Sequence, residues 1–123
     1  RSYELQDGEE VVMLPIGTFQ FEEASEVNEA QTDKAIFVDE ACLKYPLLVR
    51  KWKRGDYFYP FGMRGKKKLS KFFKDEKLSL PQKENCWLLC SGEEIVWVIG
   101  HRLDARYAVG NDTKIIIRIS FEP

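Results

Sequence analysis

The chain has little of what membrane, secreted and metal-binding proteins are rich in. None of its apolar runs approaches the roughly 20 residues of a membrane-spanning helix, and no signal peptide is visible, so we expect a cytoplasmic protein with no membrane partner. Cys42, Cys86 and Cys90 are an odd number of cysteines, which fits a reducing compartment better than a disulfide scaffold. Zinc sites usually need two cysteine or histidine pairs, and here Cys86 and Cys90 form one pair while Cys42 is distant and His101 is the single histidine, so we predict no metal site.

Signatures of catalysis and of nucleotide binding are also missing. The run Gly62-Met-Arg-Gly65-Lys66 has two residues between its glycines, where a P-loop needs four, and Lys67 follows where Ser or Thr is required. Adjacent carboxylates, such as Glu93 and Glu94, point to opposite faces of a strand. A triad of His101, Asp104 and a cysteine can be drawn, but no spacing supports it. We therefore predict no catalytic residue and no cofactor in this chain.

What the chain does have is a strong segregation of charge. The formal net charge is −1, but residues 1–49 carry three basic and eleven acidic side chains, a formal charge of −8. Residues 50–77, here called the basic block, carry eleven basic and three acidic side chains, a formal charge of +8. A near-neutral total argues against a nucleic-acid partner, whereas this local density of cations argues for one.

Length and composition predict a single domain over residues 1–123. An apolar share of 44% and an aromatic share of 13% suffice for a buried core. Because the chain opens at Arg1 and not at Met, we expect it to be a domain of a longer protein. Residues 1–44 form an acidic part with few assignable features, and residues 45–109 carry the motifs described below.

Periodicity predicts an α+β fold with mostly antiparallel sheet and two or three short helices. Apolar or alternating runs predict six or seven strands, among them residues 11–14, 18–21, 35–38, 47–52, 87–89, 95–99 and 115–121. A helical turn is expected after Asp39, a helix over residues 67–73 and another from Leu80. Residues 22–33 are polar and predict a loop or a weak helix.

The helix expected over residues 67–73 suggests an anion site. Leu69, Phe72 and Phe73 would form its inward stripe, and Lys67, Lys71 and Lys74 its outward row. Gly65 would precede the helix, so the first amide groups would be free to bind a phosphate. The alternative is a solvated lysine face that only keeps the domain soluble.

Aromatic residues interleave with the cations of the basic block. Phe58 and Phe61 are expected to anchor the loop onto the sheet, and Trp52 is a candidate for anchoring or for stacking. Tyr57 and Tyr59 alternate with them and are expected to face outward, a composition found where nucleic-acid bases stack on side chains.

Two segments of the chain resemble a known family. The first is Val49-Arg50-x-Trp52-x-x-Gly55-Asp56-x-Phe58-x-Pro60-x-Gly62-Met63-x-Gly65-x-Lys67-Lys68-Leu69-Ser70-x-Phe72. The second is Trp97-x-x-Gly100-x-Arg102-x-Asp104-x-Arg106. Together they are similar to the C-terminal domain of bacterial tRNA(Ile)-lysidine synthetase, over roughly residues 45–109.

The resemblance implies a fold and a role. The fold would be a β-sandwich-like α+β domain similar to a module of the phenylalanyl-tRNA synthetase beta subunit. The parent enzyme, a bacterial ligase, attaches lysine to the wobble cytidine of an isoleucine tRNA with ATP, through an N-terminal catalytic domain whose ATP-binding loop is absent here. This chain would then hold the tRNA acceptor stem and perform no chemistry, with the tRNA and the N-terminal domain as its partners.

The resemblance also implies site residues. Five basic positions match the family pattern: Arg50, Arg64, Lys67, Lys68 and Arg102. The basic block adds five further candidates for tRNA contact: Lys53, Arg54, Lys66, Lys71 and Lys74. Four residues are expected to shape the loop: Gly55, Asp56, Gly62 and Gly65. Asp56 is expected to pair with Arg50 or Arg54, and the chain departs from the family pattern at Lys71 and Tyr57.

A second function stays open at this point. The acidic residues 1–49 could dock on the basic block of another copy or of the catalytic domain, which would make the chain a protein-interaction or homodimerisation module.

Overall fold

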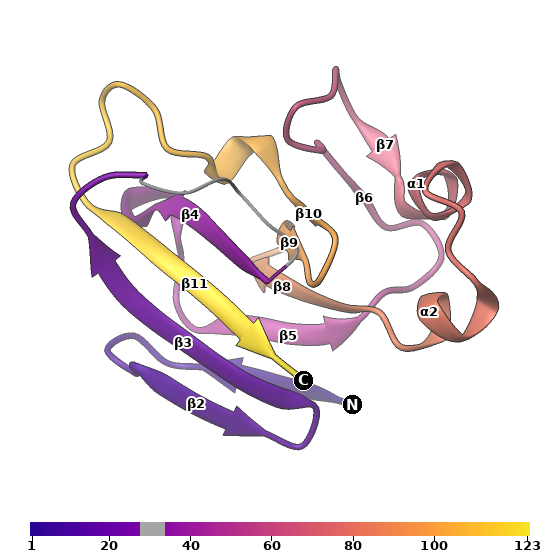
Figure 1. Cartoon of the computed structure of the whole chain (residues 1–123), viewed down its shortest axis with the longest axis horizontal. Helices are drawn as coiled ribbons and strands as arrows, with labels where there is room; N and C mark the ends of the chain where they lie inside the picture. Colours follow the sequence, from indigo (N-terminus) through magenta and orange to yellow (C-terminus); the bar gives the residue numbers. More distant parts are fainter. Residues whose placement is uncertain (28–33) are drawn as a thin grey trace.

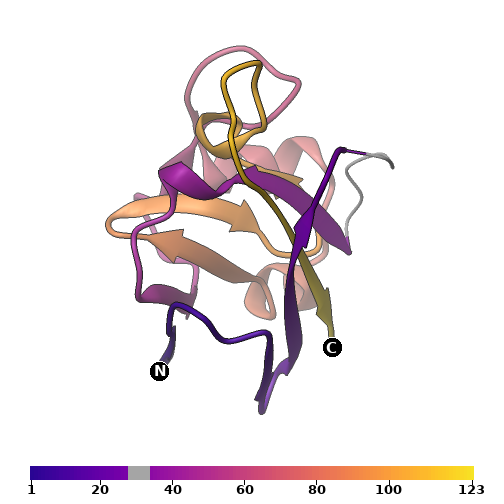
Figure 2. The same ribbon diagram turned by 90° about the vertical axis from the view of Figure 1, so that its left-hand side faces the viewer.

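The computed structural model describes residues 1–27 and 34–123 and contains two main antiparallel sheets. The five-stranded sheet has the order β1 (Ser2–Leu5), β5 (Leu47–Lys51), β8 (Trp87–Ser91), β9 (Glu94–Val98), β10 (Arg102–Leu103). The four-stranded sheet has the order β2 (Val11–Leu14), β3 (Gly17–Ala24), β11 (Ile116–Glu122), β4 (Ala35–Asp39). The two sheets form separate layers whose strands run in different directions (Figure 2). The α+β, sandwich-like fold is confirmed.

A third layer covers the face of the five-stranded sheet that is turned away from the four-stranded sheet (Figure 1). It consists of the two-stranded ribbon β6 (Tyr57–Phe58) and β7 (Lys67–Lys68) and the helices α1 (Leu69–Asp75) and α2 (Leu80–Glu84). Two short 3-10 helices complete the fold, η1 (Glu40–Cys42) and η2 (Ala105–Tyr107). No helix among the described residues has the length and apolarity to cross a membrane.

The core has two parts, one on each face of the five-stranded sheet. Between the sheets, Trp97 of β9 is fully buried with Phe19 and Ile119 of the opposite sheet. On the other face, Leu88 and Val98 pack with apolar side chains of α1. Burial on both faces explains why β8 and β9 read as continuous apolar runs without alternation.

Local signals account for several elements. The Asp39 carboxylate caps η1 by accepting a hydrogen bond from the Ala41 N–H at 3.0 Å, as expected. Ser79 and Gln82 form a reciprocal capping box at the start of α2. The hairpin expected between the apolar runs is confirmed, since Gly92 adopts φ +58° in the β8–β9 turn.

Three predictions about elements need correction. The helix begins at Leu69, because the residues before it, Lys67 and Lys68, pair with β6 as a strand. Strand β1 was not predicted, and β3 continues to Ala24, so the start of the polar segment 22–33 is strand and not loop. The end of that segment, residues 28–33, lies outside the described residues.

Candidate nucleic-acid interface

The β6–β7 ribbon mounts the basic block on the core. Phe58 is fully buried and meets Phe72 of α1 edge to face, with ring centroids 5.1 Å apart. The Leu69 N–H, at the start of α1, donates to the carbonyl of Asp56 at 2.9 Å. Ribbon and helix are therefore one unit, and the predicted inward stripe of α1 is confirmed, with Phe73 completing it.

An ion pair fixes the turn that leads into the ribbon. The Arg50 guanidinium donates to both carboxylate oxygens of Asp56, at 3.0 and 2.9 Å. The same carboxylate accepts the Lys53 N–H at 2.7 Å. The expected role of Asp56 in ordering the loop is thus fulfilled through Arg50. Donating these hydrogen bonds to Asp56 raises the pKa of the Arg50 guanidinium, and only 20% of that side chain is exposed.

The far side of the loop is fastened by Asp104, a fully buried carboxylate. It accepts hydrogen bonds from the Tyr59 N–H at 3.0 Å and from the backbone and guanidinium of Arg106. The Phe61 N–H donates to the carbonyl of Leu103 at 2.8 Å. Sequence reasoning did not place Asp104 among the site residues, although its position in the second motif was a usable signal.

After these two attachments, the rest of the loop, β7 and α1 line a groove of about 490 Å³. Its lining consists of one methionine and five cations: Met63, Arg64, Lys66, Lys67, Lys68 and Lys71. Half of the ten predicted contact residues therefore meet in one place. Gly62 and Gly65 lie in the same loop at φ +81° and +76°, a conformation that favours glycine.

Asp75 at the end of α1 moderates the positive charge of the groove. Its carboxylate lies 2.6 Å from the Lys67 ammonium and 3.0 Å from that of Lys71. The hydrogen bonds that these cations donate lower the pKa of Asp75, and the larger effect comes from Lys67. The predicted free row of lysines on a helix is therefore wrong in detail. Lys67 precedes the helix, α1 has only seven residues, and both Lys67 and Lys71 are paired with Asp75.

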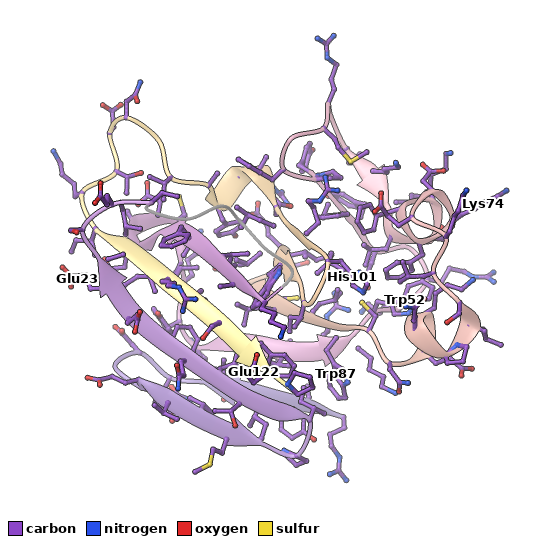
Figure 3. The ribbon with its side chains drawn as sticks, in the orientation of Figure 1. Glu23, Trp52, Lys74, Trp87, His101 and Glu122 are labelled. Atoms are coloured by element: carbon purple, nitrogen blue, oxygen red, sulfur yellow. The ribbon has the colours of Figure 1, made fainter. Side chains whose placement is uncertain are left out.

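The remaining predicted cations are not among the residues that line the groove. Lys53 and Arg54 are exposed in the turn before β6. Lys74 is on the outer side of α1 and points away from the sheets (Figure 3). The Arg102 guanidinium donates to the Phe61 carbonyl at 3.0 Å and lies 5.8 Å from the centre of the Phe72 ring.

The aromatic residues divide as expected, with two exceptions, Phe61 and the half-buried Tyr59. Phe58 is a buried anchor, and Trp52 packs edge to face on Phe73 while its indole N–H donates to the Lys83 carbonyl at 2.7 Å. Phe61, in contrast, is exposed, because it is attached to the body by its backbone and not by its ring. Tyr57 faces solvent, as predicted.

A family model described as "TilS substrate C-terminal domain" matches residues 47–120, a range that includes every predicted site residue. The chain belongs to this family. The resemblance found in the two motifs is thereby confirmed.

Relatives and solved structures agree with the family. The tRNA(Ile)-lysidine synthase of Parabacteroides distasonis is 49% identical over 85 residues, which cover 69% of this chain and 19% of the relative. That of Bacteroides thetaiotaomicron is 53% identical over 68 residues, 55% of this chain and 16% of the relative. The chain thus spans under a fifth of the length of these two relatives. A crystal structure of a TilS C-terminal domain superimposes with a TM-score of 0.78 at 23% identity, covering 99% of this chain and 97% of the other, which shows the shared fold.

The TilS C-terminal domain also has an acidic groove of about 430 Å³. Carboxylates dominate its lining: Asp7, Glu9, Glu10, Glu22, Glu23 and Glu40, with Phe21, Tyr45 and Ile117. Glu23 on β3 and Lys74 on α1 lie at opposite ends of the molecule (Figure 3). Among the described residues, every ion pair of the basic block is made within the block, to Asp56 or Asp75. The carboxylates of the acidic groove therefore do not neutralise the cations of the basic groove on α1 and the loop before it.

Proposed function

We propose that this TilS C-terminal domain binds tRNA and holds the acceptor stem of an isoleucine tRNA. The catalytic part of the enzyme, outside this chain, would attach lysine to the wobble cytidine with ATP. The domain itself would contribute affinity and substrate discrimination and no bond chemistry. The observation that carries this proposal is the groove, which is lined by five cations. Hydrogen bonds to Asp56 and Asp104 hold the segment that leads into it.

The groove suits an RNA duplex in its chemistry. An A-form helix hides its base edges in a deep, narrow major groove, so proteins contact mainly its phosphates, its 2′-hydroxyls and its shallow minor groove. Lysine ammonium groups serve as point charges for phosphates, and Arg64 adds a planar fork that can bind one phosphate with two hydrogen bonds. The names of the relatives, tRNA(Ile)-lysidine synthases, support tRNA as the RNA in question.

Charge reversal in the groove tests the proposal. In fluorescence anisotropy with an acceptor-stem minihelix, the variant Arg64→Glu/Lys66→Glu/Lys68→Glu should bind at least about a hundredfold more weakly than the wild type. If five phosphates are neutralised, the wild-type slope of log K against log salt should be roughly −4. The variant should flatten this slope to a magnitude of about 2 or less. Lys44→Glu and Lys114→Glu, at exposed positions outside the groove, are the matched controls.

The expected competitor pattern adds specificity. The minihelix should compete with full-length tRNA, whereas an anticodon stem-loop should compete poorly. Equal loss of affinity in the control variants, or no loss in the groove variant, would contradict the proposal.

The alternative, a homodimer or a contact with the catalytic domain, rests on the acidic groove. A closed two-fold dimer joined twice through acidic and basic patches needs both patches on one face. Here they lie at opposite ends, so a contact between them would be head-to-tail and would give a ring or an open chain, not a two-fold dimer (Figure 3). Sedimentation of the same charge-reversal variant separates the two functions, because a change in oligomeric state with unchanged RNA affinity would favour the alternative.

A further inference from the structure

The outer face of the β6–β7 ribbon carries aromatic and basic side chains together. Tyr57 is directly opposite Lys68 in the ladder, and Phe58 is opposite Lys67. Residues opposite each other in an antiparallel pair project from the same face, and neighbours along a strand project from opposite faces. Because Phe58 is fully buried, Tyr57 and Lys68 must project outward, and 45% of Tyr57 is exposed.

Two neighbouring aromatic rings lie between two cations along this face. The Arg106 guanidinium lies 4.4 Å from the centre of the Tyr59 ring, and Tyr59 meets Tyr57 edge to face at 6.4 Å. The Lys66 ammonium lies 4.5 Å from the centre of the Tyr57 ring. Lys66 and Lys68 both line the basic groove as well. The exposed ring of Tyr57 is therefore next to the groove that we assign to phosphates.

The hollow on the other side of Tyr57 is too small to enclose a base. It has about 80 Å³ and is lined by Gly55, Tyr57, Glu93 and Arg106 among others. Such a volume takes two or three water molecules. A base at this place would lie on the ring, at the surface, and not in a closed pocket. Stacking of this kind tolerates any base, because every base has a π-face.

We propose that Tyr57 is a stacking platform for an unpaired nucleotide next to the bound duplex, with Lys66 and Lys68 on the phosphates that flank it. This inference rests on the proposed function, since it assumes that the groove binds RNA. The base stacks on the Tyr57 ring, and the Lys66 ammonium moves from the ring to the phosphate. The flexible four-carbon stem of lysine allows this movement.

Two RNAs test the platform with the whole 123-residue chain. One is a blunt hairpin, and the other is the same hairpin with a single-stranded extension of about four nucleotides that contains 2-aminopurine. The extension should strengthen wild-type binding by about 5- to 100-fold, and the 2-aminopurine fluorescence should be quenched by stacking. Tyr57→Ala should remove the gain and the quenching while leaving the affinity for the blunt hairpin unchanged.

Two further variants separate the ring from the fold. Tyr57→Phe keeps the ring and should keep both effects. Phe61→Ala removes another exposed aromatic side chain of the same loop, which makes no ring contact with Tyr57 or Tyr59 in the part of the chain that the structure describes. This variant should change neither the gain in affinity nor the quenching. A gain that survives in Tyr57→Ala would overturn the platform, as would equal wild-type affinity for both RNAs. If the wild type binds neither RNA, the proposed function fails together with the platform.

Discussion

The ion pair between Arg50 and Asp56 allows a direct test of whether Arg50 serves the fold or the RNA. Both guanidinium nitrogens that reach Asp56 are within 3.0 Å of its oxygens, and one of them also donates to the Lys51 carbonyl at 3.1 Å. Exposed fractions of 20% for the Arg50 side chain and 8% for that of Asp56 place the pair mostly out of water. We therefore expect Arg50 to position the loop and not to contact RNA.

The magnitude follows from burial. Removing one partner of a fully buried pair costs about 3–5 kcal/mol, because the other charge is left without compensation. Since Arg50 keeps a fifth of its surface in water, we expect Asp56→Asn to lower the unfolding free energy by about 2–3 kcal/mol. Arg50→Met should cost a similar amount by isolating the Asp56 carboxylate. The double variant has no unpaired charge, so its loss should stay near that of one single variant, with a coupling energy of about 2 kcal/mol.

Urea unfolding followed by tryptophan fluorescence measures all four species of this cycle. The double variant gives the control, because it removes the pair without leaving a buried charge. Single variants that cost less than about 0.5 kcal/mol, or losses that add in the double variant, would refute the assignment of a coupled pair. A loss of RNA affinity in folded Arg50→Met as large as that of the groove variant would refute the positioning role.

Three further predictions concern the groove and the core. Asp75→Asn should free Lys67 and Lys71 of the groove, raise RNA affinity and steepen the slope of log K against log salt by about 1. Titrations at several salt concentrations would detect this change, and an unchanged slope would exclude these lysines from phosphate contact. Burial raises the pKa of Cys86 to about 12 and of Cys90 to about 11, so stability from the two neutral thiols is complete below pH 9. The unfolding free energy should fall by up to about 3 kcal/mol per pH unit between pH 9 and 11, with about half that slope in Cys86→Ala. Gly17→Ala should cost about 1–3 kcal/mol in urea unfolding, because its Cβ would meet the β11 backbone at 2.5 Å, whereas Gly110→Ala, with no atom within 4 Å, should be close to neutral.

Strands with a clear period were predictable, and strands that depend on a distant partner were not. Residues 115–121 alternate, and they coincide almost fully with β11, an inner strand of the four-stranded sheet. Ser2–Leu5 has no such pattern, and it is a strand because it pairs with Leu47–Lys51, more than 40 positions away. The apolar spacing in α1 was read correctly, but it could not reveal that Lys67 and Lys68 pair with β6 across a loop.

The candidate site shows the same division between local and distant signals. The cations of the groove were visible in the composition of residues 50–77. The pairing of Lys71 with Asp75 was also foreseeable, since the two are four positions apart on a helix. The role of Asp104 was not foreseeable from spacing, because its partner, the Tyr59 N–H, lies 45 positions earlier. Only the fold brings that carboxylate to the loop.

The two attachments of the loop explain how a glycine-rich segment can present cations in a defined arrangement. A free loop would have to lose its conformational entropy on binding, at about 0.5–1.5 kcal/mol for each immobilised long side chain. Asp56 fixes the turn between β5 and β6, and Asp104 holds the backbone directly after β6. Because both carboxylates are used within the protein, they order the cations without cancelling the charge of Arg64, Lys66 or Lys68. Under the proposed function, RNA affinity would then depend on acidic residues that do not touch the RNA, and a count of cations alone does not identify such residues.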